Sequence, residues 1–278
     1  MISSPLNHFK PALFLFALSF LYLSSGAQIA DSAMRKVSLQ GVVNFRDIGG
    51  YKTNDGKQVV WGRIYRSGAL SRTTAADREE LYNRRITSIF DFRNLDEALS
   101  GPDTVWQDAV YMRCGAGSEQ LSNWGTILKT LTTGDSLLNS FYGSVDSLGA
   151  RYKPLFQKLM NQPKREAVVY HCSSGKDRTG IATALILHAL GVPDATIWQD
   201  YEASNFYRQR ENERAIAVLS ANGYPRAVAE DLVVVKPSYL QTTWDALNKK
   251  YGTIDNFLDK ELGMGPDQLK KLREKYTK

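Results

Sequence analysis

The fold of this chain is decided by residues 167–190, which read AVVYHCSSGKDRTGIATALILHAL. The first five residues, rich in β-branched and aromatic side chains, are typical of a strand. The apolar residues after Arg178 recur at helical spacing, and Gly191 and Pro193 predict the end of that helix. The residues from Cys172 to Arg178 are left for a tight turn. The stretch therefore predicts a strand that passes through a tight turn into a helix.

Segments on either side predict further strands and helices. Four more stretches predict strands: VVNF at 42–45, VVWGRIYR at 59–66, ITSIFDF at 86–92 and AVYMR at 109–113. Helical patterns occupy 74–85 and 136–162 and, after the quoted stretch, 194–219, 225–234, 237–250, 253–262 and 266–276. Strands that alternate with helices and then give way to a run of helices predict the α/β class. We expect a mainly parallel sheet flanked by helices, with a helical C-terminal cover.

The N-terminal segment predicts a secretory signal peptide. Lys10 precedes PALFLFALSFLYL at 11–23, an uncharged apolar run that is shorter than the ~20 residues needed to span a bilayer. Small residues follow it, and cleavage is expected after Ala27. The alternative is a retained membrane anchor. We expect a signal peptide at 1–27 and one catalytic domain at 28–278, exported to the periplasm or secreted, without stable membrane insertion after cleavage.

The composition is that of a globular protein. Of the 278 residues, 43% are hydrophobic and 23% charged, and a chain this long can bury a sizeable core without disulfides or metals. The formal net charge of +6, which suits an anionic substrate, falls only to +5 when Lys10 is removed. The sequence does not alternate basic with aromatic residues as a nucleic-acid groove would, so no nucleic-acid partner is predicted. Three histidines without paired spacing argue against a zinc site. No metal or other cofactor is predicted.

The turn carries residue types suited to bind and attack a phosphate ester. Cys172 precedes a helix N-terminus, whose partial positive charge and unpaired N–H groups favour a thiolate or a bound phosphate. Gly175 is free to adopt positive φ, and Arg178 offers a planar fork to two phosphate oxygens. A thiolate of low pKa can attack phosphorus and form a covalent phosphocysteine. The residues expected to bind the substrate are Ser173, Ser174, Gly175, Lys176 and Thr179.

The residues that flank the turn strengthen this interpretation. Thr179 can donate a hydrogen bond to the sulfur of Cys172 and stabilise its anion. His171 is either a group that tunes the turn or a satisfied core histidine. A Cys followed six residues later by Arg is a weak pattern, but His-Cys-x-x-Gly-x-x-Arg-Thr-Gly between strand and helix is specific. The alternative is a purely structural strand–turn–helix.

At these residues the chain resembles the cysteine-dependent tyrosine phosphatases. More narrowly, it is similar to a bacterial branch with Gly-Lys-Asp-Arg in the loop, which includes secreted mycobacterial and listerial enzymes acting on phosphoproteins and phosphoinositides. Further motifs extend the resemblance over roughly residues 40–260: Asn44-Phe-Arg-Asp-Ile-Gly-Gly50, Tyr65-Arg-Ser67, Asp91-Phe-Arg93 and Asp200-Tyr201 with Ser204-Asn205. The resemblance implies a cysteine-phosphatase-like fold, Cys172 as nucleophile and Arg178 as phosphate clamp. It also implies that Lys176 and Asp177 bear on substrate choice and turnover.

The general acid has two main candidates. The Trp-Pro-Asp tripeptide that carries the acid in many tyrosine phosphatases is absent, and Gly101-Pro-Asp103 matches only two of its residues. Asp177 lies within the loop, whereas Asp91 ends a predicted strand, and sites in α/β sheets form at the carboxyl ends of strands. We expect Asp177 and Asp91 to act, with Asp103 a distant third. The alternative for Asp91 is a structural ion pair with Arg93 or Arg66.

Three functions stay open at this point. The leading one is a protein-tyrosine phosphatase whose partner is a phosphorylated protein. The second is a phosphoinositide or inositol-phosphate phosphatase, which acts on phospholipid and is favoured by the extra cation of Lys176. The third is a non-catalytic phosphate-binding module, which such a loop becomes when its cysteine is lost.

The second cysteine allows a redox hypothesis. Cys114 follows the strand predicted at 109–113, which places it at the same sheet edge as Cys172. A neighbouring thiol can resolve an oxidised catalytic cysteine as a disulfide. The alternative is that Cys114 is a small buried hydrophobic residue.

Overall fold

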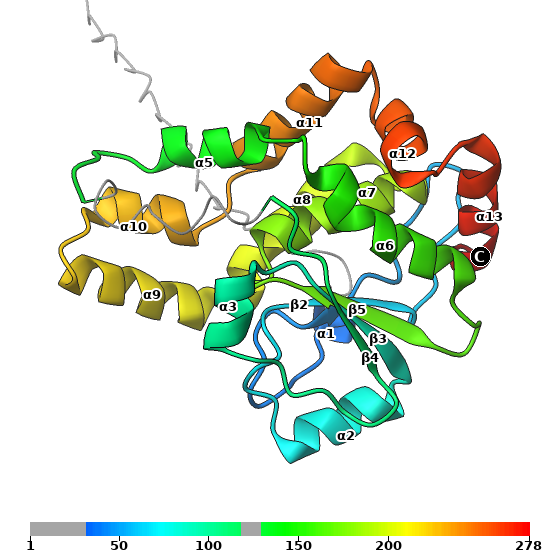
Figure 1. The fold of residues 1–278 in the computed structure, drawn as a ribbon, viewed down its shortest axis with the longest axis horizontal. Coiled ribbons are helices and arrows are strands. Elements are labelled where there is room, and N and C mark those ends of the chain that lie inside the picture. The colour runs from blue at the N-terminus through cyan, green and yellow to red at the C-terminus, as the bar shows by residue number, and fades with distance from the viewer. Residues whose placement is uncertain (1–31, 118–128) are drawn as a thin grey trace, which may run out of the picture.

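The protein is built around a twisted β-sheet, seen in a computed structural model that describes residues 32–117 and 129–278 (Figure 1). Within these residues the sheet has five strands in the order β1-β2-β5-β3-β4. Only β1 runs antiparallel to its neighbour, and the other pairs are parallel. The strands are β1 (Arg46–Asp47), β2 (Ile64–Ser67), β3 (Ile86–Asp91), β4 (Val110–Arg113) and β5 (Ala167–His171). The predicted mainly parallel sheet is confirmed.

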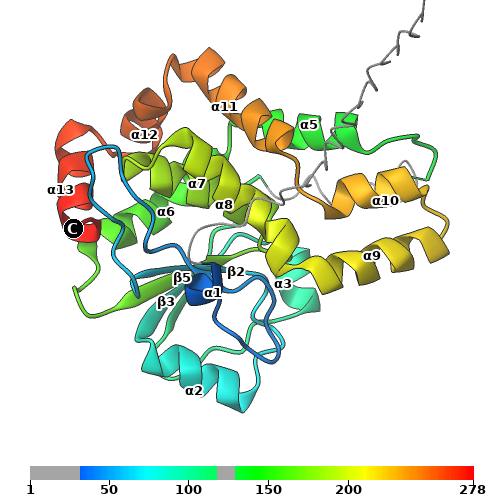
Figure 2. The same ribbon diagram turned by 180° about the vertical axis from the view of Figure 1, so that it is seen from behind.

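Helices cover both faces of the sheet, as the two opposite views show (Figures 1 and 2). Helix α2 packs against β3, while α7 packs on β2 and β5 and is itself covered by α8, α11, α12 and α13. The described helices are α1 (Ser32–Arg35), α2 (Ala75–Asn83), α3 (Leu95–Ser100), α5 (Asp135–Gly143), α6 (Leu148–Asn161), α7 (Asp177–Ala189), α8 (Asp194–Tyr207), α9 (Gln209–Ala221), α10 (Arg226–Val233), α11 (Pro237–Tyr251), α12 (Ile254–Leu262) and α13 (Pro266–Tyr276). This arrangement confirms the helical C-terminal cover.

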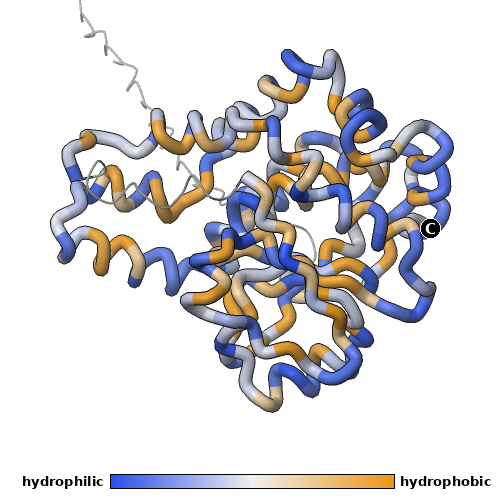
Figure 3. The backbone as a smooth tube through the Cα atoms, in the orientation of Figure 1, coloured by the Kyte–Doolittle hydropathy of each residue, from blue (hydrophilic) through white to orange (hydrophobic). Residues whose placement is uncertain are grey.

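The central strand β5 joins the two halves of the core because its side chains alternate between the faces of the sheet. Val168 and Tyr170 belong to a cluster with α6 and α7, and Ala167 and Val169 belong to a second cluster with Leu81 of α2. Every residue of β5 is buried. Apolar residues accordingly concentrate in the central strands and in α7, and alternate with polar residues along the outer helices (Figure 3). A strand covered on both faces reads as a continuous apolar run.

Two predicted strands differ from the structure. The strand predicted at 42–45 is wrong, because Asn44 adopts a φ of 60° in the left-handed region and β1 begins only at Arg46. Asparagine tolerates that region because its short side chain can bond locally. The strand predicted at 59–66 begins at Ile64, after Gly62 with its φ of 76°.

Two predicted helices are each a pair of helices. The pattern at 136–162 comprises α5 and α6, which are separated at Ser144, where a ψ of 89° is not helical. The pattern at 194–219 comprises α8 and α9, which meet at Arg208 with a φ of −115°. Gly143 and the Ser144-Val-Asp-Ser147 run are typical of a turn and mark the first break in the sequence, whereas no Gly or Pro marks the break at Arg208.

No helix among the described residues is long and apolar enough to cross a membrane. The signal peptide predicted at 1–27 lies outside the described residues.

Candidate active site

The turn from Cys172 to Arg178 lies at the carboxyl end of β5, the strand that pairs with both β2 and β3. Helix α7 begins at Asp177, so the turn is closed by a helix N-terminus, where unpaired N–H groups favour an anion. The predicted strand–turn–helix is confirmed.

Three carbonyl groups in the middle of the turn, those of Ser173, Ser174 and Gly175, are held from outside. The Ser173 carbonyl accepts from the Ala69 amide at 3.1 Å, and the Ser174 carbonyl accepts from Arg208 at 2.8 Å. The Gly175 carbonyl is bound by two side chains, Asn44 Nδ2 at 2.8 Å and Arg66 Nη2 at 3.0 Å. Because the C=O and N–H groups of a planar trans peptide point in opposite directions, the N–H groups are left for the inner side of the turn. This is the geometry of an anion-binding nest.

Gly175 is required by this geometry. Its φ of 67° lies in the left-handed region, and a Cβ there would lie 2.3 Å from the Ser67 carbonyl oxygen. Only glycine adopts that conformation freely and fits that gap.

Cys172 has the environment of a thiolate. Its side chain is buried, and Thr179 Oγ1 donates to its Sγ at 3.2 Å. Burial alone would raise the pKa of the thiol, but the Arg178 charge and the Thr179 hydrogen bond outweigh it, so the pKa lies below the ordinary value. The predicted contact between Thr179 and the sulfur is present.

Arg178 is held by a residue that the sequence interpretation missed. Glu97 accepts from Nη1 at 2.6 Å and from Nη2 at 2.8 Å, in the paired geometry that a phosphate would also use. The Ser173 hydroxyl donates to the same carboxylate at 2.5 Å. Glu97 is also the N3 residue of a capping box that begins at Asn94. The Asn94-x-x-Glu97 spacing directly after Asp91-Phe-Arg93 was the available signal, but it is common to many helix starts.

The Glu97–Arg178 pair predicts a pH dependence of stability. Burial raises the pKa of Glu97, but Arg178 and Ser173 lower it from 4.5 to about 2. Because the pKa is lower in the folded chain than in the unfolded one, the stabilisation is complete above pH 4.5 and is lost as the pH falls toward about 2. Glu97→Gln should remove this dependence, which we expect to be about 1–3 kcal/mol for a partly exposed pair.

Urea unfolding at several pH values measures this effect. The stability gap between wild type and Glu97→Gln should close as the pH falls through that window. A matched control is Glu80→Gln, since Glu80 pairs with Arg84 on the exposed side of α2 with a half-exposed carboxylate. A gap that stays constant for Glu97→Gln would contradict the assigned pKa.

Asp177 lies at the start of α7 with its carboxylate partly exposed. Its Oδ1 accepts from the Tyr142 hydroxyl at 2.5 Å and lies 3.3 Å from Lys176 Nζ. The ammonium group of Lys176 also donates to the Leu232 carbonyl of α10 at 2.7 Å, and the side chain is buried. Lys176 was predicted to bind substrate, but in this structure it ties the turn to α10.

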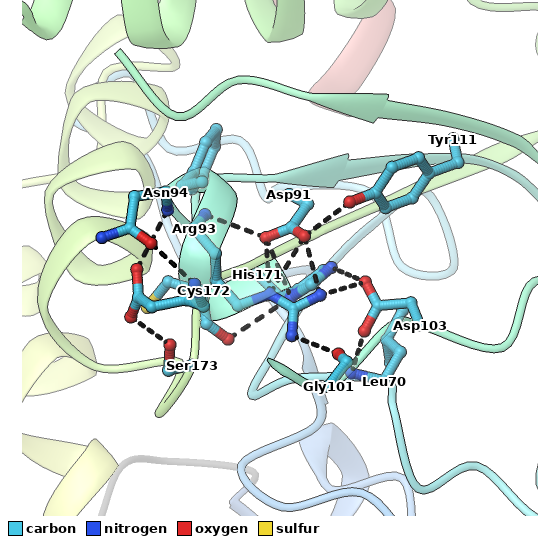
Figure 4. Close-up of polar contacts among 12 residues, drawn as sticks. Leu70, Asp91, Arg93, Asn94, Gly101, Asp103, Tyr111, His171, Cys172 and Ser173 are labelled. Carbon is cyan, nitrogen blue, oxygen red and sulfur yellow. Dashed lines mark hydrogen bonds and ion pairs between the residues drawn. The ribbon is translucent and has the colours of Figure 1, made fainter. Parts of the chain in front are cut away.

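Asp91 lies in a buried polar cluster with other partners (Figure 4). Its carboxylate accepts from Arg93 Nη2 at 2.8 Å and from the Tyr111 hydroxyl at 2.7 Å. Burial raises its pKa, but His171 and Arg93 outweigh burial and keep the carboxyl ionised. This geometry favours the alternative, a structural ion pair with Arg93, over the predicted role of general acid, because an acid must carry a proton and reach the leaving group.

The same cluster accounts for Asp103 and His171. Asp103 Oδ2 lies 2.9 Å from His171 Nε2 and 3.0 Å from Arg93 Nη2. Burial lowers the pKa of His171, but Asp103 and Asp91 outweigh burial and raise it above its usual value. His171 is therefore a buried histidine within ion-pair distance of two carboxylates, and it adds positive charge directly before the nucleophile, which favours the interpretation that it tunes the turn. Asp91, Asp103 and His171 could together ligate a metal, but Arg93 already places a cation between the two carboxylates.

Residues of the motifs outside the turn that carry the family resemblance lie beneath the turn and support it. Arg46 and Arg66 are fully buried, and both pair with Asp200, with Arg46 Nε at 3.2 Å from the carboxylate. Burial raises the pKa of Asp200, but the two arginines outweigh it and lower the pKa well below its ordinary value. Arg46 therefore lies beneath the turn rather than toward the substrate. Two guanidinium charges against one carboxylate leave positive charge under the turn, which favours an anion above it.

Cys114 does not lie beside Cys172. It follows β4, whereas Cys172 follows β5, and β3 runs between these strands. Two interstrand spacings put the Cα atoms about 10 Å apart, beyond the reach of a disulfide without backbone movement. Both thiols are free and buried, and burial with the Asp91 charge raises the pKa of Cys114 to about 11. These observations favour a small buried hydrophobic residue.

Comparison with known proteins gives a consistent set of relatives. The model of the tyrosine phosphatase family matches residues 37–278. A Cupriavidus necator protein named as a tyrosine-protein phosphatase is 32% identical over 262 residues, which cover 88% of this chain and 94% of the relative. A tyrosine-protein phosphatase of Nostoc commune is 34% identical over 146 residues, covering 51% and 48%. The triple specificity protein phosphatase PtpB of Mycobacterium tuberculosis is 26% identical over 273 residues, covering 84% and 96%.

Proposed function

The chain belongs to the tyrosine phosphatase family, and from that premise we propose how its residues carry out the reaction. The Cys172 thiolate attacks the phosphorus of a phosphotyrosine ester while the turn amides and Arg178 bind the phosphoryl oxygens. The observation that carries this proposal is the buried Cys172 sulfur, which accepts from Thr179 at 3.2 Å inside a turn whose Ser173, Ser174 and Gly175 carbonyls are bound from outside. A thiolate held in an anion-binding nest is the arrangement that phosphocysteine chemistry needs.

The reaction proceeds in two steps. In the first, a sulfur–phosphorus bond forms, the bond from phosphorus to the tyrosine oxygen breaks, and Asp177 gives that oxygen its proton. In the second, water attacks the phosphocysteine, Asp177 takes the proton of the water, and inorganic phosphate leaves as the thiolate is restored. Arg178 stabilises the charge on the phosphoryl oxygens in both steps. Its guanidinium must pass from Glu97 to the phosphate, in whole or in part, as the ester binds.

A substrate panel tests this function. We expect turnover of a phosphotyrosine peptide that is unchanged by a chelator, because Arg178 and the turn amides supply the charge stabilisation. A phosphoserine peptide and phosphoinositide vesicles belong in the same panel, since the relative from Mycobacterium tuberculosis is named for triple specificity. The case for a lipid substrate rested on Lys176, and that side chain is engaged by Leu232 and Asp177. Turnover that requires added metal would contradict the mechanism, and phosphate binding without turnover would point to a non-catalytic module.

The general acid is identified by its leaving-group dependence. Asp177→Asn should lower kcat/KM on phosphotyrosine about 10²–10⁴-fold and on a p-nitrophenyl ester much less, because kcat/KM reports the first step and a good leaving group needs no proton there. Asp91→Asn should lower both rates by the same small factor, because Asp91 is expected to hold Arg93 and His171 in place. Steady-state kcat/KM values on the two esters make the comparison, because kcat also includes the second step, which both esters share. The assignment to Asp177 would be refuted by equal losses of kcat/KM on both esters in Asp177→Asn.

We also propose that the enzyme is exported. The proposal rests on the apolar run at 11–23 followed by small residues up to Ala27. The mature protein should be recovered outside the cytoplasm with Gln28 as its first residue, as N-terminal sequencing can establish. Membrane-bound protein that retains the run would support the alternative of an anchor.

A further inference from the structure

A chain of two buried hydroxyl groups ends on Asp177. The Tyr201 hydroxyl of α8 donates to the Tyr142 hydroxyl of α5 at 2.7 Å, and the Tyr142 hydroxyl donates to Asp177 Oδ1 at 2.5 Å. Both tyrosines are almost completely buried, with 1% of their surface exposed, whereas the Asp177 carboxylate is 22% exposed. The chain thus leads from the interior to one oxygen of the carboxylate.

The surrounding packing holds this chain in place. The ring of Tyr201 lies against the first turn of α7, where a Cβ on Gly180 would be 2.8 Å from the ring. The ring of Tyr142 stacks on Tyr239 with centroids 5.5 Å apart. Glycine at 180 therefore allows the close approach that brings Tyr201 to Tyr142. The hydrogen bonds from Tyr201 to Tyr142 and from Tyr142 to Asp177 thus depend on the packing of three helices, α5, α7 and α8.

We propose that Tyr142, supported by Tyr201, is a positioning residue for the general acid. By binding Oδ1 it fixes the rotation of the Asp177 carboxylate and leaves Oδ2 for the proton that the leaving oxygen receives. By donating to the ionised carboxylate it also favours the form that takes the proton of water in the second step. This inference rests on the proposed role of Asp177.

Tyr142 can act only as a donor toward Asp177 in the working pH range. Burial and the neighbouring Asp177 charge raise its pKa well above that of a free phenol, so its proton stays in place. Because that proton goes to Asp177, its oxygen is free to accept from Tyr201. Other charged groups act on Asp177 as well: Lys176 at 3.3 Å, and, through space, Cys172, Arg178 and Arg208. A change made at Tyr142 alone leaves these charges unaltered.

The pH profile of kcat/KM gives a readout that a merely structural role would not move. Because the Tyr142 hydrogen bond is stronger to an ionised carboxylate than to a neutral one, its loss in Tyr142→Phe should shift the alkaline limb upward by about one pH unit. It should also lower kcat/KM on phosphotyrosine roughly tenfold, with a change of less than about twofold on a p-nitrophenyl ester, because kcat/KM reports the first step alone. Tyr201→Phe, which keeps the Tyr142 contact, should give a smaller shift in the same direction.

Tyr239→Phe is the matched control, since it removes a tyrosine hydroxyl from the same aromatic stack. That hydroxyl donates to Asp135 rather than to Asp177, so the limb should stay in place. If Tyr142→Phe does not fold because the Tyr201 hydroxyl loses its partner, the double variant Tyr142→Phe/Tyr201→Phe removes both hydroxyls and should show the same shift. An unshifted limb in the folded variant, or an equal shift in Tyr239→Phe, would overturn the proposal.

Asp177→Asn separates two kinds of failure. If it abolishes the alkaline limb and Tyr142→Phe leaves the limb unshifted, Asp177 is the acid and only the role of Tyr142 is wrong. If the limb persists in Asp177→Asn, another residue is the acid, and the role proposed for Tyr142 fails with that of Asp177.

Discussion

Cys172→Ser should abolish turnover, with a loss of kcat on the order of 10⁴-fold or more, while phosphotyrosine peptide still binds. A serine hydroxyl keeps the shape of the site but ionises far less readily than a thiol. In the wild type, burial opposes ionisation of Cys172, and the Arg178 charge and the Thr179 hydroxyl outweigh it. The same two groups remain in the variant, and so do the turn amides. Cys172→Ser should therefore keep the binding of the peptide and lose the chemical step.

Calorimetry with a phosphotyrosine peptide measures the binding, and single-turnover kinetics measure the chemistry. Cys114→Ser is the control because Cys114 is the other thiol of the chain and lies beyond β3 from the site. It should keep a near-normal rate. Residual turnover in Cys172→Ser at a substantial fraction of the wild-type rate would show that the Cys172 thiolate is not the nucleophile.

Asp200→Asn should lower the free energy of unfolding by about 3–5 kcal/mol. Asp200 neutralises Arg46 and Arg66, and all three side chains are buried beneath the turn. Asparagine has nearly the same shape but leaves two guanidinium charges in the interior without a counter-charge. Arg66 also donates to the Gly175 carbonyl, so displacement of Arg66 in the variant should also disturb the conformation of the turn.

Urea unfolding of the variant tests this value. Asp255→Asn is the control, since Asp255 pairs with His188 at the surface with 62% of its side chain exposed. That variant should change stability by less than about 0.5 kcal/mol. A loss below about 1 kcal/mol in Asp200→Asn would show that the buried arginines are compensated in some other way.

The turn and its surroundings could be predicted from sequence because they are local. The residue types of 167–190 determine a strand, a nest and a helix within one short segment, and Gly175 is required there by backbone geometry. The break at Ser144 had an available signal, because Gly143 and a run of Ser and Asp residues surround it, whereas no Gly or Pro marks the break at Arg208. The strand predicted at 42–45 was wrong because Val42, Val43 and Phe45 have high strand propensity. The positive φ of Asn44, a single residue, does not show in that pattern.

The partners of the site residues could not be predicted because they depend on long-range packing. Tyr142 lies 35 positions before Asp177 and Glu97 lies 81 before Arg178, so neither pair has a spacing that points to contact. Asp91 was placed correctly at a strand end, but its pairing with Arg93 and Tyr111 depends on side-chain rotamers and on register with β4. Strand ends identify the edge of a site more reliably than they identify its acid.

Trapping of the phosphoenzyme tests the central claim most directly. Acid quenching during turnover of a p-nitrophenyl ester, followed by digestion and mass spectrometry, locates any covalent phosphoryl group. We expect one on the peptide that contains Cys172, more abundant in Asp177→Asn because the second step lacks its base, and absent in Cys172→Ser. Continued turnover with no phosphoryl group on Cys172, or with the group on another residue, would contradict the account.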